Sequence, residues 1–133
     1  MDAKDYVLLL LSVGNQKSVY GALFLQLVVF LIVEEINPDL RDELEFRATD
    51  TGAYSTNLIR ILKELDDAGF ISYEDIDDTV AYSITETGES YIKSINFPED
   101  VRGKIRNLKK GSDRLGYTGL LRYVYFKYPD FFI

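Results

Sequence analysis

The strongest constraint on this chain is the apolar stretch from Val19 to Ile36, which reads VYGALFLQLVVFLIVEEI. Drawn as a helix, it has apolar side chains on every face: Leu23, Leu27, Phe30 and Val33 on one, and Phe24, Val28, Leu31 and Ile32 on the others. A helix that is hydrophobic all round is buried in a core, in a subunit interface or in a membrane. The run Val19–Val33 has only 15 residues and contains Gln26, whereas a membrane-spanning helix needs about 20 apolar residues. We therefore expect no membrane span, and a helix covered by the chain itself or by a partner.

Several residue types that common catalytic and metal sites use are missing from the chain. The chain has no cysteine and no histidine, so it lacks thiol nucleophiles, disulfides, the commonest metal ligand and the usual general base at neutral pH. It also has no phosphate loop and no dinucleotide fingerprint. The acidic run Glu74–Asp78 lacks the glycine and terminal glutamate of an EF-hand loop. We therefore expect no enzyme, no cofactor and no metal site.

Length and the N-terminal sequence set the expected organisation. The 133 residues predict a single domain, 1–133, with a core over about 2–95 and a helical extension over about 98–133. The first residues do not resemble the basic start of a signal peptide. We therefore expect a cytoplasmic protein.

Charge is distributed unevenly along the chain. Residues 1–100 carry 7 Lys and Arg against 20 Asp and Glu, whereas residues 101–133 carry 8 against 2. The acidic body disfavours non-specific contact with nucleic acid, while the basic last third offers a local contact surface.

The first part of the chain reads as two helices followed by a polar segment. Asp2–Val13 has apolar residues at helical spacing, and Ser18 is in position to cap the long apolar helix. We expect a short helix over Asp39–Phe46 and a turn at Thr49–Gly52.

Ser55–Gly69 is the clearest helix. Ser55 is a good N-cap, Gly69 suits the position after the C-terminus, and a buried stripe is formed by Leu58, Ile61, Leu62 and Leu65. Phe70–Glu74 and Val80–Ile84 then read as the strands of a hairpin with an acidic tip.

The rest of the chain is predicted to be helical. Thr85 caps a helix over Glu86–Ile95. A helix beginning at Pro98 is expected to end at Gly111, and a last helix over Tyr117–Tyr128 is stopped by the proline that follows.

The expected order of elements is that of a winged helix-turn-helix domain: two helices, a capped helix, a hairpin and another helix. In this class one helix can enter the DNA major groove. The alternative is a small α+β core with no such function. We predict an α+β, mostly helical fold of the winged-helix type, with a two-stranded wing and additional C-terminal helices.

Several short motifs resemble archaeal winged-helix transcriptional regulators and, distantly, the Panacea domain of some antitoxins. Gly52–Ser55 is similar to the "GPYS" that opens their third helix, and Leu25–Leu31 to the "LQKLVFL" of their second helix. Tyr82–Gly88 resembles the "Y-x-L-T-x-x-G" that closes many wings, and Tyr123–Pro129 resembles a C-terminal "YVY-x-x-YP". Two positions depart from the pattern, because Ala53 replaces the proline and Leu27 replaces the lysine. The resemblance implies regulation or partner binding, and no catalysis.

If the third helix reads DNA, its polar face supplies the contacts. Asparagine can bind adenine with two hydrogen bonds, and arginine can bind guanine or phosphate. The candidate DNA-binding residues are Ser55, Thr56, Asn57, Arg60 and Lys63. The alternative is an ordinary solvated helix face, and the acidic hairpin counts against DNA because carboxylates repel phosphates.

The strongest electrostatic candidate is the basic run after residue 100. Its members could contact the DNA backbone or an acidic partner, or could balance the acidic body of the same chain or of a second copy. They are Arg102, Lys104, Arg106, Lys109, Lys110 and Arg114.

The aromatic tail has more rings than one face of a short helix can bury. It is expected to pack against the long apolar helix or against a second subunit. Its members are Tyr123, Tyr125, Phe126, Tyr128, Phe131 and Phe132.

These patterns lead to two hypotheses about function. The first is a homodimeric regulator of transcription that binds double-stranded DNA. The second is a protein-protein interaction module, antitoxin-like or scaffold-like, that has the winged-helix fold and does not bind DNA.

Overall fold

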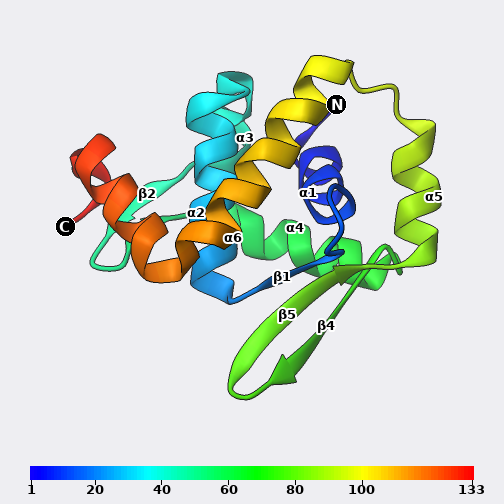
Figure 1. The fold of residues 1–133 in the computed structure, drawn as a ribbon, viewed down its shortest axis with the longest axis horizontal. Coiled ribbons are helices and arrows are strands. Elements are labelled where there is room, and N and C mark those ends of the chain that lie inside the picture. The colour runs from blue at the N-terminus through cyan, green and yellow to red at the C-terminus, as the bar shows by residue number, and fades with distance from the viewer.

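The computed structural model describes residues 1–133 and has the α+β composition that the sequence predicts (Figure 1). The elements, in chain order, are α1 (Ala3–Ser12), β1 (Ser18–Tyr20), α2 (Ala22–Glu35), η1 (Pro38–Leu40), α3 (Arg41–Leu44), β2 (Arg47–Thr49), β3 (Gly52–Tyr54), α4 (Thr56–Asp67), β4 (Ile71–Ile76), β5 (Thr79–Ile84), α5 (Glu86–Ser94), α6 (Glu99–Lys127) and η2 (Pro129–Phe131).

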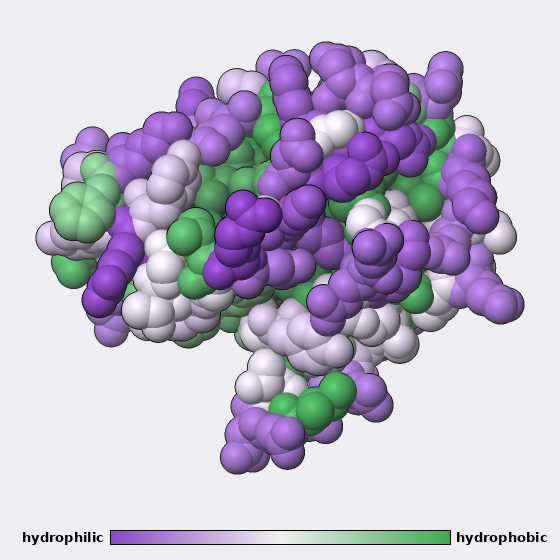
Figure 2. Space-filling view, in the orientation of Figure 1, coloured by the Kyte–Doolittle hydropathy of each residue, from purple (hydrophilic) through white to green (hydrophobic).

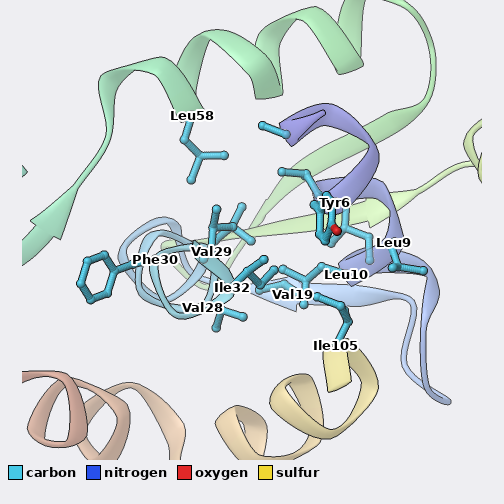
Figure 3. Packing of buried hydrophobic residues seen from close by; sticks show 14 of the residues in the cluster. Tyr6, Leu9, Leu10, Val19, Val28, Val29, Phe30, Ile32, Leu58 and Ile105 are labelled. Carbon is cyan, nitrogen blue, oxygen red and sulfur yellow. The ribbon is translucent and has the colours of Figure 1, made fainter. Parts of the chain in front are cut away.

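Helix α2 lies at the centre of the fold. Every residue from Phe24 to Val33 is buried, which confirms that this part of the apolar stretch is enclosed, whereas Tyr20 and Leu23 at its start are exposed. Figure 3 shows α4 with Leu58 on one side of α2 and α6 with Ile105 on the other. Helix α1 completes the enclosure with its own buried run, Leu8–Leu11. No helix has both the length and the apolar character that crossing a membrane requires.

The start of α2 differs from the sequence prediction. Ser18 does not cap the helix; it lies in β1, which pairs antiparallel with β5, and its hydroxyl is 2.7 Å from that of Ser83. The helix begins after Gly21, whose φ of 102° is accessible mainly to glycine. The long helix is therefore shorter at its N-terminus than predicted, because pairing with a distant strand takes Ser18–Tyr20 out of it.

The β4–β5 hairpin is confirmed and is longer than predicted. Its ladder runs from Ile71 opposite Ile84 to Ile76 opposite Thr79. Only Asp77 and Asp78 remain in the turn, both with positive φ, as a two-residue hairpin turn matched to the strand twist requires. Strand β1 adds to β5, giving a sheet in the order β1-β5-β4.

The polar segment between α2 and α4 contains more structure than the sequence suggested. The short helix expected over Asp39–Phe46 is present as η1 and α3, in which Leu40 and Leu44 are buried. The expected turn after Thr49 is also present, and it joins a second small hairpin, β2–β3, that was not predicted. The C-terminus lies against this hairpin, because the Ile133 N–H donates to the Thr49 carbonyl at 3.1 Å.

The end of the basic helix was predicted wrongly. The helix does not stop at Gly111; it continues to Leu115 and breaks at Gly116, which has φ 71° and ψ 178°. A glycine inside a helix costs only about 1 kcal/mol relative to alanine, and Ser112, the next residue after Gly111, is buried within the continuing helix. The final helical segment then begins at Tyr117, as expected.

Candidate interaction surface

The first turn of α4 is fixed from two directions. The Ser55 hydroxyl accepts from the Leu58 N–H at 3.0 Å and donates to the Leu44 carbonyl. The buried amide of Gln26 accepts from the Ser55 N–H at 2.8 Å and donates to the Ser55 carbonyl at 3.0 Å. Ser55 is therefore confirmed as the N-cap, but it is fully buried and cannot contact DNA as predicted.

Asn57 is also engaged within the chain. Its side-chain amide donates to the Glu43 carbonyl and to the Glu45 carboxylate, both at 3.0 Å. This amide therefore holds α4 to the end of α3. Reading a base, as the sequence hypothesis required, would first need both of these hydrogen bonds to break.

The remaining predicted contacts of α4 are exposed. Thr56, Arg60 and Lys63 share the outer face of the helix. Arg60 pairs with Glu64 at 2.7 Å and Lys63 with Asp67 at 3.5 Å. Exposed pairs of this kind are weakened by solvent and contribute little to stability, so both cations can exchange partners.

An apolar groove of about 460 Å³ lies between α4 and the β4–β5 hairpin. Its lining is Ile59, Leu62, Lys63, Tyr73, Glu74, Asp75, Val80 and Tyr82. Ile59 is 43 % exposed and Tyr73 is 48 % exposed, so two large apolar side chains meet solvent at this place. The Tyr73 and Tyr82 rings are 5.7 Å apart, and burial raises the pKa of the Tyr82 hydroxyl.

The hairpin side of this groove is acidic, with Glu74 and Asp75 in the lining, whereas α4 contributes Lys63. Glu74, Asp75, Asp77 and Asp78 are exposed on the hairpin, and none of them forms an ion pair. Figure 2 shows a hydrophobic patch among hydrophilic atoms on this projecting hairpin. The surface of α4 and the hairpin therefore combines apolar contacts with unpaired negative charge.

The groove was not predicted from the sequence, although the position of Ile59 indicates it. Ile59 lies outside the buried stripe of α4 and one position before Arg60. A large aliphatic residue on the polar face of an amphipathic helix is a sign of a contact surface when other apolar groups adjoin it. The adjoining groups come from the hairpin, and only the fold reveals them.

The basic side chains of α6 form a separate surface. Five of them are exposed or half-exposed and have no carboxylate partner: Arg102, Lys104, Arg106, Lys110 and Arg114. Figure 2 shows strongly hydrophilic atoms across the face over which α6 runs. Because α4 and α6 lie on opposite sides of α2 (Figure 3), these cations and the outer face of α4 do not form one continuous surface.

Lys109 does not belong to that exposed surface. Lys109 is only 4 % exposed, and its ammonium group donates hydrogen bonds to the carbonyls of Leu11, Val13 and Gln16 at 3.2, 3.0 and 2.6 Å. Lys109 therefore satisfies backbone groups at and just after the C-terminus of α1, and it cannot make the predicted backbone or partner contact. Burial lowers its pKa to about 8.

Part of the aromatic tail packs inside the chain, with Tyr128 and Phe131 against α2 and Phe132 against β3, which was one of the two predicted arrangements. The centroid of the Phe30 ring is 5.3 Å from that of Tyr128 and 4.7 Å from that of Phe131, and a Cβ at Gly52 would lie 3.0 Å from the Phe132 ring. Tyr125 and Phe126 remain on the surface, and Phe126 is 80 % exposed.

A polar cluster joins the same tail to the end of α2. The Glu35 carboxylate accepts hydrogen bonds from Tyr123, Lys127 and Tyr128, each at 2.8 Å. Burial opposes ionisation of Glu35, but these hydrogen bonds outweigh it and lower its pKa. The pKa of Tyr128 is raised to about 12, mainly by burial and to a smaller extent by the hydrogen bond to Glu35.

No group of three or more acidic side chains is arranged to hold a metal ion. Comparison of the chain with models of protein families and with curated proteins gives no match.

Proposed function

We propose that this chain is a non-catalytic protein of the winged-helix class that binds another protein through the groove between α4 and the β4–β5 hairpin. The succession of α1, α2 and α4 before the hairpin, with β1 as a third strand, supports the winged-helix part. The segment between α2 and α4 contains η1, α3, β2 and β3 and is longer than the turn of about 3–4 residues that a helix-turn-helix normally has there.

The observation that carries the proposal is the chemistry of the groove. A winged helix that binds DNA through its third helix and wing presents that surface to phosphates, which carry one negative charge per about 1.7 Å of duplex. Here the hairpin presents four unpaired carboxylates, Asn57 is bonded to Glu43 and Glu45, and Ser55 is buried. Each of these features disfavours DNA and is compatible with a protein partner.

The groove also indicates the chemistry of the partner. Ile59, Tyr73 and Val80 offer apolar contact area, and Glu74 and Asp75 flank it with negative charge. A complementary segment carries one or two apolar anchors next to lysine or arginine. Apolar anchors fix the affinity and the charges raise the association rate.

The test is selection of short random peptides on the immobilised protein, followed by measured affinities. We expect enrichment of peptides that combine aromatic or aliphatic residues with cations. Ile59→Ser should weaken the best peptide at least about tenfold, or roughly 1.4 kcal/mol. The matched control is Leu115→Ser, because Leu115 is an exposed aliphatic residue of α6 outside the groove. Equal effects of the two substitutions, or selection of acidic peptides, would contradict the proposal.

A second candidate is DNA binding and regulation of transcription, and the unpaired cations of α6 favour it. Five cations without carboxylate partners are available to phosphates, and Thr56, Arg60 and Lys63 are exposed on α4. Each phosphate that a cation neutralises adds about 0.9 to the slope of log affinity against log salt. Fluorescence polarisation with duplex DNA tests it: salt-sensitive binding that Arg60→Ala or Arg114→Ala weakens supports this candidate, and the absence of binding at low salt excludes it.

A further inference from the structure

A second concave site lies between the loop after α1 and the first half of α6. Its volume is about 330 Å³, at the low end of small-molecule sites. The lining is Val13, Gly14, Asn15, Gln16, Arg106, Lys109, Lys110 and Asp113. Only Val13 is hydrophobic, so the site suits a polar ligand, and it shares no residue with the groove beside α4.

Lys109 gives this site a positive charge held in a buried position. Its three protons are all donated to backbone carbonyls, and no carboxylate lies within ion-pair distance. Carbonyl dipoles solvate the ammonium but leave its net charge in place. Because the surroundings are poorly polarisable, that charge attracts an anion more strongly than an exposed lysine does.

Two further cations supply free donors at the same place. Arg106 and Lys110 are one helical turn apart on the same side of α6, are exposed, and have no ion-pair partner. The guanidinium group can bind two oxygens of one phosphate or carboxylate. Asn15 and Gln16 also line this site, and both residues are exposed.

One group opposes an anion here. Asp113 is the only carboxylate in the lining, and it forms no ion pair. Three cations against one carboxylate leave the site positive. Removal of the Asp113 charge should therefore strengthen anion binding, whereas removal of either free cation should weaken it.

We propose that this pocket binds a small molecule through a phosphate group, with Arg106 and Lys110 as direct donors and Lys109 as the fixed positive charge beneath them. The three cations converge on one concave site, and a chain with net charge −7 has no other such concentration of cations in a pocket. The proposal does not depend on the function of the α4 groove.

The experiment is a calorimetric or NMR titration of the whole chain with pyrophosphate, at constant ionic strength set by chloride. Arg106→Gln and Lys110→Gln should each weaken binding about tenfold, and Asp113→Asn should tighten it severalfold. Lys104→Gln is the matched control, because Lys104 is an exposed cation of the same helix outside the pocket. It should leave binding within about twofold of the parent.

Three outcomes would overturn the proposal. The first is the absence of saturable binding at millimolar pyrophosphate. The second is equal weakening by Lys104→Gln and Arg106→Gln, which would mean that the whole basic helix attracts anions without a pocket. The third is tighter binding of duplex DNA with equal losses in all the lysine and arginine variants, which would make phosphate recognition a property of the α6 surface.

Discussion

Replacement of Gln26 by leucine is the sharpest test of how the fold positions α4. Gln26 is a buried polar residue in the most apolar helix of the chain, at 2 % exposure. Its amide makes two hydrogen bonds, both to the backbone of Ser55. Leucine has a similar volume, so the substitution removes the hydrogen bonds with little change in packing.

The expected loss of stability follows from the two backbone groups left behind. The Ser55 N–H and carbonyl lie in the core, and an unpaired buried polar group costs about 1–3 kcal/mol. Burial of the more apolar leucine side chain returns roughly 1–2 kcal/mol. The net loss should be about 2–3 kcal/mol, which lowers the melting temperature of a chain of this size by about 10 °C.

Urea denaturation followed by circular dichroism measures this change, and hydrogen exchange of the Ser55 and Leu58 amides locates it. Gln16→Leu is the control, because the Gln16 side chain is exposed and forms no hydrogen bond; it should change stability by less than about 0.5 kcal/mol. If Gln26→Leu is as harmless as Gln16→Leu, the two hydrogen bonds do not hold the start of α4 and this reasoning is refuted.

Four other predictions concern packing, titration and assembly. Gly88→Ala should destabilise the chain by about 1–3 kcal/mol, because a Cβ there would lie 2.2 Å from the Phe70 carbonyl oxygen. Gly111→Ala should instead stabilise it by about 0.5–1 kcal/mol, because nothing lies within 4 Å of a Cβ at that position. Thermal melts of the two variants test this difference. The stability advantage of the parent over Glu35→Gln should be complete above the ordinary carboxyl pKa of about 4.3 and should disappear as the pH falls through the lowered pKa of Glu35; a difference that does not vary between pH 3 and pH 6 would contradict this. The pKa of Lys109 is lowered as well, so its pH dependence has the same sign at higher pH. The folded chain binds fewer protons than the unfolded chain between the pKa of about 8 and the unfolded value of about 10.4, so the parent should gain stability relative to Lys109→Met as the pH rises through that window. Light scattering should show a dimer of the 15.3 kDa chain that Phe126→Ser weakens, and a monomer at every concentration would refute the dimer.

Local signals made much of the fold predictable from the sequence. Ser55 and Gly69 bracket α4 as cap and stop, Thr85 caps α5, and the acidic turn at Asp77-Asp78 closes a hairpin. Each of these features depends on residues within one turn of the chain, so the sequence alone carries the information. The burial of α2 was predictable for a different reason, because apolar residues on every face leave a helix no exposed side.

The features that were missed depend on contacts between distant residues. Strand β1 is only three residues long and exists because Ser18 meets Ser83 on β5. Lys109 resembled its neighbours as a surface cation, yet the position of α1 turns its ammonium toward three carbonyls. The groove beside α4 needs Ile59 from a helix and Tyr73 from a hairpin, and no spacing in the sequence relates the two.

The most direct test of the proposed function is an NMR map of backbone amide shifts during titration with the best selected peptide. Binding in the groove should give saturable shifts around Ile59, Tyr73 and Tyr82 and little change on α6. Shifts confined to α6, or spread evenly over the chain, would contradict the assignment of the groove as the partner site.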